Sequence, residues 1–440
     1  MYSNKEIFRI SYPIFLGLIA QNIVNVTDTA FLGRVGEVEL GASALAGVCY
    51  IALFMIAFGF SQGSQILIGR RNGEKKYDAI GEIFFHGVIF LMLMGILVFA
   101  GVHAFAGDTL RSFLSSPEIS DAAVRFLDVR IWGVFFVFPN VMFRAFFVGI
   151  TRTKVLTANA IVMAVINIIL DYALIFGNWG FPEMGIEGAA LASVIAEACS
   201  LLFFIIYLIA DVDWKKYGFE WKFRYDLKVI RNMLDISVFT MLQSFVSLST
   251  WFLFFAFVEQ LGERPLAISN IVRSLYMILL MPIQALSATS NTMISNAIGA
   301  GDTDKVLHII MKIIRMAYYI LIPISLAIVL FPKAFISIYT TDPVLLADSI
   351  QPLWVLVGGI LFAAAGSIMF NAISGTGNTR SSLFFEVISL IVYTGYMWYI
   401  IYVLRSSVTI CWTTELVYWL VLLLTCYPYL LSGKWKNRKI

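Results

Sequence analysis

Residues 157–177, TANAIVMAVINIILDYALIFG, form an apolar run that contains one carboxylate, Asp171. A helix that crosses a lipid bilayer needs about 20 predominantly apolar residues, so this run predicts a membrane span. A second run, ISYPIFLGLIAQNIVNVTDTAFLG at residues 10–33, contains Asp28. An ionised carboxylate at the bilayer centre costs roughly 2.5–3.5 kcal/mol on insertion scales.

Both carboxylates have amide neighbours in their own runs: Asn22, Asn25 and Asn167. An ionisable residue inside a membrane span points to a functional site by default. The two runs therefore predict a cation or proton site inside a transporter.

The whole composition agrees with a membrane protein. The 440 residues are 60% hydrophobic and 13% charged, with a mean hydropathy of +0.85, whereas soluble domains average about 45–50% apolar and 25% charged. We therefore expect an all-α membrane protein without a cleaved signal peptide. The predicted spans are 10–33, 43–69, 81–105, 123–149, 156–177, 186–209, 232–260, 266–298, 307–331, 348–373, 382–404 and 409–431.

Basic residues are placed unevenly along this pattern. Alternate connections, beginning with the N-terminus, hold 22 of the 31 Lys and Arg residues, and the opposite connections hold five. The positive-inside rule then places both termini in the cytoplasm, which requires an even number of spans. The longest polar connection, 211–231, is rich in Trp, Tyr, Lys and Arg, and we expect an amphipathic linker helix along the cytoplasmic membrane surface.

The chain also repeats itself. Gly36 and Gly262 follow the first and seventh spans, and Gly149 and Gly375 follow the fourth and tenth, both at an offset of 226. We pair Gly73 with Gly301 at an offset of 228. These landmarks predict two pseudo-symmetric six-helix bundles, residues 1–210 and 232–440, related by a parallel repeat.

The two halves differ in their polar residues. At the offset of 226, Phe254 corresponds to Asp28, Tyr393 to Asn167 and Met397 to Asp171. We therefore expect ion chemistry in the first half alone.

At this point the chain resembles the MATE (multidrug and toxic compound extrusion) family over its whole length. The resemblance rests on Pro13, on Thr27–Gly33 (TDTAFLG), on Gln65–Gly73, on Asn167–Tyr172 (NIILDY) and on Gly185–Ser193 (GIEGAALAS). It implies a V-shaped fold of twelve helices. It also implies a secondary antiporter that exports amphipathic, often cationic, organic compounds in exchange for Na⁺ or H⁺ by alternating access.

The resemblance further assigns roles to single residues. In the family's DinF-like branch, Asp28 and Asp171 match the acidic pair that carries the coupling ion. Asn167 matches an asparagine ligand, Ser193 a hydroxyl ligand, and Ala189 a backbone carbonyl ligand. Pro13 matches the proline at which the first helix kinks, where a missing backbone hydrogen bond lets the helix bend.

Spacing supports this assignment. Asn167 and Asp171 are four residues apart and share one helix face. With Asp28 and Ser193 they form an all-oxygen cage suited to a hard cation such as Na⁺, and the acidic pair alone could instead share a proton. Both possibilities remain open, as does a hydrogen-bond network that only joins helices.

The other branch of the family, which is NorM-like, places acids in the seventh and tenth helices. The matching stretches here, Thr240–Phe245 and Met369–Ala372, contain none. A second-half cation site of that type is therefore not expected.

Further polar residues could line a substrate cavity in the first half: Asn22, Asn25, Tyr50, Gln62, Asn140 and Tyr172. The roles of Glu197, Glu386, Glu415, Arg144 and Arg273, which also fall in apolar runs, stay open.

Two rival functions remain at this stage. One is a lipid-linked oligosaccharide flippase of the same superfamily, which would need several cationic cavity residues. The other is an intramembrane aspartyl enzyme, although neither acid lies in a recognised protease motif. We expect no enzyme activity, no cofactor other than the coupling ion, no nucleic-acid partner, and a monomer in contact with lipid in the bacterial inner membrane.

Overall fold

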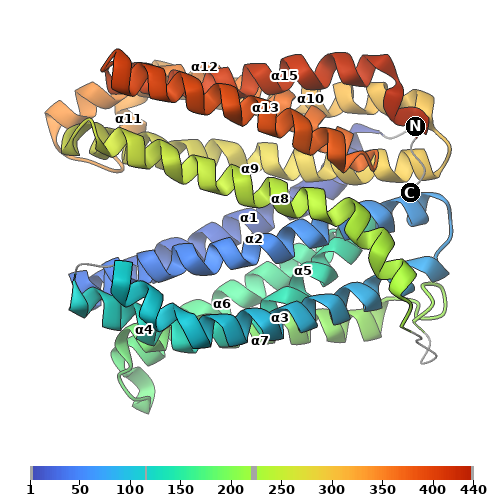
Figure 1. Cartoon of the computed structure of the whole chain (residues 1–440), viewed down its shortest axis with the longest axis horizontal. Helices are drawn as coiled ribbons and strands as arrows, with labels where there is room; N and C mark the ends of the chain where they lie inside the picture. Colours follow the sequence, from blue (N-terminus) through green and yellow to red (C-terminus); the bar gives the residue numbers. More distant parts are fainter. Residues whose placement is uncertain (1–2, 114–115, 220–224, 438–440) are drawn as a thin grey trace. The chain divides into compact units, whose positions relative to one another are not determined.

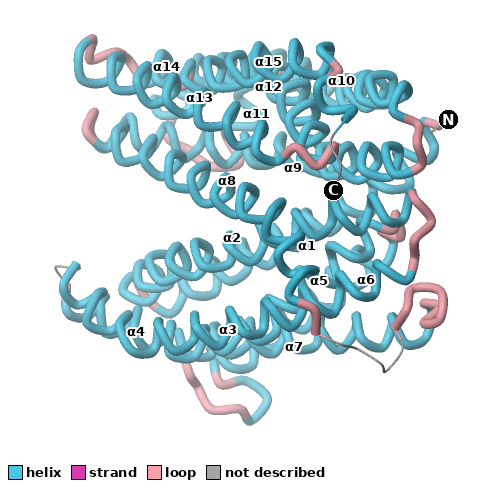
Figure 2. The backbone as a smooth tube through the Cα atoms, turned by 45° about the vertical axis from the view of Figure 1, so that its right-hand side comes forward, coloured by secondary structure: helices cyan, strands magenta, loops and turns pink. Residues whose placement is uncertain are grey.

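The computed structural model describes residues 3–113, 116–219 and 225–437, and these residues form helices joined by short loops, without a strand (Figure 2). Within this part of the chain, twelve helical segments are long and apolar enough to cross a membrane. The predicted all-α architecture with twelve spans is therefore confirmed, and the chain is an integral membrane protein.

Most spans are single helices, and several exceed the predicted limits at both ends. They are α1 (Asn4–Val35), α2 (Glu37–Gly73), α3 (Asp78–Phe113), α6 (Lys154–Phe176), α7 (Gly185–Asp211), α8 (Leu227–Glu259), α9 (Glu263–Gly299), α10 (Val306–Leu330) and α12 (Pro343–Gly375).

Three spans are interrupted. The fourth joins α4 (Pro117–Arg130) to α5 (Val134–Gly149) through a 3₁₀ turn at Ile131–Gly133. The eleventh passes from α13 (Thr379–Trp398) into a π-helical segment, Tyr399–Val403, and the twelfth joins α14 (Val408–Cys411) to α15 (Thr413–Ser432). Such breaks often mark functional positions in helices, and the first of them lies beside Arg130.

The chain forms two compact units: an N-terminal unit, Tyr12–Met241, and a C-terminal unit that combines Met1–Ser11 with Leu242–Ile440. In the N-terminal unit, α6 packs along α7 and α2 along α5; in the C-terminal unit, α12 packs along α9 and α15 (Figure 1). The chain passes from one unit to the other inside two helices, α1 and α8. The predicted domain limits at 210 and 232 and the V-shaped arrangement stay predictions.

The repeat has one offset throughout, which corrects one predicted pairing. Helices α2 and α9 have equal lengths and end at Gly73 and Gly299, which are 226 residues apart. Gly301, with φ 82°, therefore corresponds to Lys75, with φ 61°, and not to Gly73. Both positions have a left-handed backbone after the helix. Because one of them is a lysine, the positions of the glycines alone did not reveal the correspondence.

The connection 211–231 also differs from its prediction. Residues 212–219 form turns and not a helix, and residues 220–224 lie outside the described residues. Asp213 accepts hydrogen bonds from the backbone N–H groups of Lys215 and Lys216 (3.1 and 3.2 Å), and Gly218 has a φ of 66°. These local side-chain hydrogen bonds compete with the helical ones, so the segment turns.

Candidate functional site

Three helices of the N-terminal unit bring the predicted ligands together. Asn167 and Asp171 lie one turn apart on α6, with exposed fractions of 1% and 0%. Asp28, on α1, is half-buried, and its carboxyl group interacts directly with that of Asp171. The predicted acidic pair therefore lies between α1 and α6.

Ser193 joins this cluster from α7. The Asn167 side-chain amide donates to the Ser193 hydroxyl at 3.5 Å. Ala189 lies one turn before Ser193 and is buried. Its role as a carbonyl ligand stays a prediction, because α7 is a continuous helix there and its carbonyls accept intrahelical bonds.

The cluster has more acceptors than donors. Asp28 Oδ1, Asn167 Oδ1 and both carboxyl oxygens of Asp171 are buried and accept no hydrogen bond from any residue that the structure describes. Buried polar oxygens are normally satisfied, and each exception needs an explanation. Buried oxygens without donors suit a proton or a hard monovalent cation, because oxygen is the ligand that hard cations prefer.

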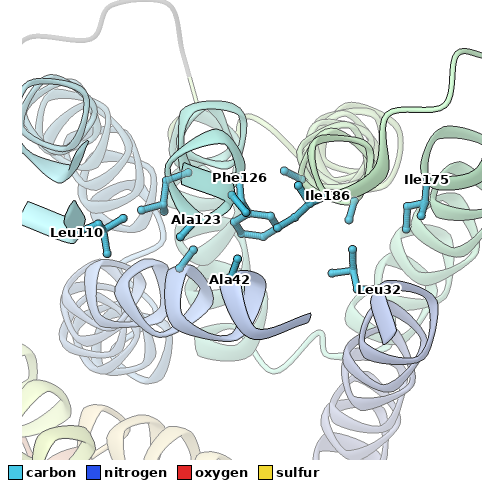
Figure 3. Packing of buried hydrophobic residues seen from close by; sticks show 12 residues of the cluster. Leu32, Ala42, Leu110, Ala123, Phe126, Ile175 and Ile186 are labelled. Atoms are coloured by element: carbon cyan, nitrogen blue, oxygen red, sulfur yellow. The ribbon is translucent and has the colours of Figure 1, made fainter. Parts of the chain in front are cut away.

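Apolar side chains close the site along the helix axes. Leu32 and Ile175 lie one turn beyond Asp28 and Asp171, and they belong to a buried cluster with Phe126 and Ile186 (Figure 3). On the other side, Ala20, Val24 and Ala164 form a smaller buried cluster between α1 and α6. Apolar residues thus flank the two carboxyl groups along the helix axes, and apolar surroundings strengthen electrostatic interactions.

A second polar cluster in this unit contains residues that the sequence suggested separately. Arg130 forms a two-point ion pair with Glu197, with Nη1–Oε2 and Nη2–Oε1 distances of 2.9 and 2.5 Å. Tyr50 donates to Glu197 at 3.4 Å, and Asn140 donates to the Glu197 carbonyl at 3.0 Å. Tyr50 and Asn140 thus contact Glu197. Arg130 was not selected from the sequence, although a charge inside an apolar run could have identified it.

The other predicted cavity residues lie elsewhere. Asn22 and Gln62 are half-buried, and Asn25 is exposed and accepts a hydrogen bond from Gln21 at 3.4 Å. Tyr172 is 43% exposed, and its ring packs against Trp179 with centroids 5.2 Å apart. It follows Asp171 directly in a helix, so its side chain points away from that carboxyl group.

The predicted hinge at Pro13 lies beside a point where the chain changes unit, between Ser11 and Tyr12. The hydroxyl of Thr157, on α6, donates to the Pro13 carbonyl at 3.0 Å. At this proline α1 lacks one backbone donor, which allows a helix to bend, and the hinge role stays a prediction.

Two buried glutamates of the C-terminal unit have hydroxyl partners. Glu386 accepts hydrogen bonds from Ser247 and Tyr418, the latter at 2.9 and 3.0 Å. Glu415 accepts from Tyr276 at 2.8 Å and from Tyr393 at 3.3 Å. Neither has an ion-pair partner among the residues that the structure describes.

Arg144 and Arg273, whose roles the sequence left open, each lie over an aromatic ring. The guanidinium of Arg144 lies 5.2 Å from the ring centroid of Phe58, and that of Arg273 lies 5.1 Å from Phe255. These are distances at which a cation interacts with an aromatic face.

Comparison with known proteins adds to this geometry. A family model described as MatE matches residues 13–173 and 240–398. A probable multidrug resistance protein NorM of Thermotoga maritima is 25% identical over 393 residues, which cover 88% of this chain and 83% of that protein. A probable multidrug resistance protein YoeA of Bacillus subtilis is 23% identical over 342 residues, covering 75% of this chain and 72% of that protein.

Solved structures agree on the fold. An outward-facing multidrug resistance MATE family transporter of the MOP superfamily has a TM-score of 0.89 at 19% identity, with 99% of this chain and 97% of that chain covered. A MOP superfamily transporter from Pyrococcus furiosus has a TM-score of 0.86 at 18% identity, covering 98% and 95%. The matches extend over both halves of the repeat.

Proposed function

Because the chain belongs to the MatE family, we propose that it is a secondary antiporter that exports amphipathic, often cationic, organic compounds in exchange for Na⁺ or H⁺. The relatives named as multidrug resistance proteins support this substrate class. We place the chain in the DinF-like branch, because its acids lie on the first and fifth spans and not on the seventh and tenth.

One observation carries the coupling part of this proposal. The Asp171 carboxyl group is fully buried inside a membrane span, interacts with Asp28, and accepts no hydrogen bond from the described residues. Two neighbouring buried carboxyl groups without a hydrogen-bond donor are expensive to ionise together, so we expect the site to be most stable with a cation or a proton bound.

Each residue then has a defined task. Asp28, Asn167 and Asp171 supply oxygen ligands to Na⁺, with Ser193 and the Ala189 carbonyl at the edge of the site; with H⁺, the two carboxyl groups share the proton. Asn167 has its amide nitrogen turned to Ser193, which leaves its oxygen for the cation. Asn22, Asn25, Gln62 and Tyr172 are the more accessible polar candidates for the substrate.

Coupling requires that cation and substrate favour different conformations. The cation neutralises the acidic pair and draws α1 toward α6, and α1 bends near Pro13 as it does so. The substrate occupies the same cavity of the N-terminal unit, so the two ligands exclude one another. The cation then drives release to the outside, and its departure resets the cycle.

The expected setting is the bacterial inner membrane, with both termini in the cytoplasm. This orientation follows from the distribution of Lys and Arg over alternate connections. The protein acts as a monomer in this proposal.

The test uses purified protein in liposomes loaded with a fluorescent organic cation. Efflux is measured under an imposed Na⁺ gradient and, separately, under an imposed pH gradient, for the wild type and for Asp28→Asn and Asp171→Asn. Efflux under one gradient, lost in both variants, supports antiport and identifies the ion. Unchanged gradient-driven efflux in both variants refutes the proposed site.

The lipid-linked oligosaccharide flippase is the less favoured alternative. A pyrophosphate-linked substrate requires a cavity with several free cationic groups. Arg130 is neutralised by Glu197 at 2.5 Å, and Arg144 and Arg273 each lie over a phenylalanine ring. Absence of any ion-driven efflux in the liposome experiment would favour this alternative.

A further inference from the structure

Arg130 and Glu197 form a buried ion pair that the proposed cycle has not used. Their side chains are 13% and 11% exposed, and the guanidinium contacts the carboxylate at two points. A buried ion pair rarely adds net stability over apolar residues, because both charges lose their hydration. Its presence beside a cation site therefore calls for a functional explanation.

Neighbouring residues fix the position of the Arg130 guanidinium, and we call this surrounding its seat. Its central carbon lies 3.8 Å from the ring centroid of Tyr50, so the ring face carries part of the positive charge. The 3₁₀ turn that follows Arg130 places Gly133 against the pair, and a Cβ there would meet Arg130, Glu197 and the Tyr50 hydroxyl. Helices α2, α4 and α7 and the 3₁₀ turn thus contribute to the seat.

The charge of Arg130 also reaches the cation site. Glu197 follows Ser193 by one helical turn on α7, and the Ser193 hydroxyl accepts a hydrogen bond from Asn167 at 3.5 Å. Phe126, one turn before Arg130 on α4, packs in the same buried cluster as Leu32, one turn after Asp28 on α1. The charge of Arg130 therefore acts on acids of two clusters, on Glu197 in direct contact and on Asp28 at longer range.

We propose that Arg130 is a positioning residue that sets the cation affinity of the Asp28–Asp171 site. Its fixed positive charge partly balances Asp28, and its ion pair with Glu197 keeps the guanidinium outside the site. This inference rests on the proposed function. When the cation leaves, the charge of Arg130 partly balances Asp28, which lowers the cost of the cation-free state. Glu197 and Tyr50 keep the guanidinium from occupying the site itself, so the cation can return.

Under this proposal, removing the charge of Arg130 and removing that of Glu197 change the cation affinity in opposite directions. Replacing Arg130 with Met removes the balancing charge, so the site binds the cation more tightly. Replacing Glu197 with Gln releases Arg130 toward Asp28, so the site binds the cation more weakly. A pair that only joins helices would give shifts in the same direction, because either variant breaks the same contact.

The experiment measures gradient-driven efflux from liposomes against the concentration of the coupling cation. We expect the half-saturating concentration to fall about fivefold or more in Arg130→Met and to rise by about the same factor in Glu197→Gln, the range of a typical coupling energy between sites. Arg130→Lys keeps the charge but loses the two-point contact, so we expect its half-saturating cation concentration to lie between those of the wild type and Arg130→Met. Tyr50→Leu keeps both charges but removes the ring face and the hydroxyl that hold Arg130 and Glu197, so we expect its half-saturating cation concentration to rise.

If removal of a charge prevents folding, Tyr50→Leu still tests the proposal, because it keeps both charges. A fall or no change in its half-saturating cation concentration overturns the proposal. Shifts of the same sign in Arg130→Met and Glu197→Gln, or no shift in either, overturn it as well. Asp171→Asn is measured in parallel. If that variant still couples efflux to the cation, the proposed function fails; if it does not, the Arg130 and Glu197 variants test the inference alone.

Discussion

In the N-terminal unit, both carboxyl oxygens of Asp171 lie buried without a hydrogen-bond donor, whereas in the C-terminal unit the Glu415 oxygens accept hydrogen bonds from Tyr276 and Tyr393. Both carboxyl groups are buried in membrane spans, so burial does not distinguish them. What differs is the supply of donors, and a carboxyl group without donors is the better cation ligand.

The repeat makes this comparison sharper. At the offset of 226, Tyr393 corresponds to Asn167, Glu415 to Ala189 and Trp419 to Ser193. Trp419 donates to the Tyr276 hydroxyl at 2.8 Å, and Tyr276 in turn donates to Glu415. The positions proposed to bind a cation in the N-terminal unit thus correspond in the C-terminal unit to aromatic side chains and their hydrogen bonds.

The largest expected effect is the loss of coupling in Asp171→Asn. An amide keeps the shape but removes the charge, so we expect gradient-driven efflux to fall about a hundredfold, at the upper end of the effect of altering a metal site. The measurement is initial efflux from liposomes under the coupling gradient. The matched control is Glu415→Gln, the same change in the other unit. If both variants lose coupling equally, the distinction between the units is wrong.

The second largest effect is expected at Pro13, because the two helices in which the chain changes unit differ there. Near the change of unit α1 contains Pro13, whereas α8 is fixed to α2 by hydrogen bonds from Ser237 to the Phe60 carbonyl (3.2 Å) and from Thr240 to the Gly59 carbonyl (2.6 Å). Replacing Pro13 with Ala restores a backbone donor and stabilises an unbent helix by up to about 3 kcal/mol. We expect turnover about tenfold slower or worse, with the half-saturating cation concentration changed much less.

Thr157→Val is the companion of Pro13→Ala. It removes the hydroxyl that donates to the Pro13 carbonyl but leaves the proline in place. We expect a change of turnover smaller than that of Pro13→Ala, because one hydrogen bond contributes about 1 kcal/mol. A Pro13→Ala variant with wild-type turnover would remove the hinge from the mechanism.

A smaller effect is expected for the glutamates of the C-terminal unit. Glu386→Gln and Glu415→Gln keep one carbonyl oxygen but disturb the hydrogen bonds from Ser247, Tyr418, Tyr276 and Tyr393. We expect a loss of about 1–3 kcal/mol in stability, seen as a lower unfolding temperature in detergent, with an unchanged response to the coupling cation. A changed cation response in Glu386→Gln would give the C-terminal unit a coupling role.

The smallest effect concerns a pair of turn positions that the repeat relates. Thr151 has a φ of 62° and Gly377, 226 residues later, a φ of 86°. The left-handed conformation costs an L-residue roughly 1–2 kcal/mol. We therefore expect Gly377→Ala to lower the unfolding temperature. Thr151→Gly should leave the unfolding temperature unchanged or raise it slightly, because the relief of strain is partly offset by backbone entropy. Equal destabilisation by both variants would contradict this.

Much of the site followed from spacing alone. Asn167 and Asp171 had to share a helix face because they are four residues apart, and their joint burial confirms that geometry. The carboxyl pair with Asp28 followed from the resemblance to the family. By contrast, Tyr50 and Asn140 contact Glu197, and the sequence did not relate these residues to one another. The pairing of Gly73 with Gly301 failed because a left-handed position can be filled by lysine as well as by glycine.

The sequence by itself determined that the chain crosses the membrane with twelve helices, that it repeats after 226 residues, and that carboxylates lie inside its spans. These properties depend on hydrophobicity and on spacing along one helix, which are local. Only the tertiary structure decided which carboxyl groups lack donors, that Arg130 pairs with Glu197, and that Thr157 donates to the Pro13 carbonyl. Those contacts join residues 67 and 144 positions apart, and the packing of helices, not their sequence period, brings such residues together.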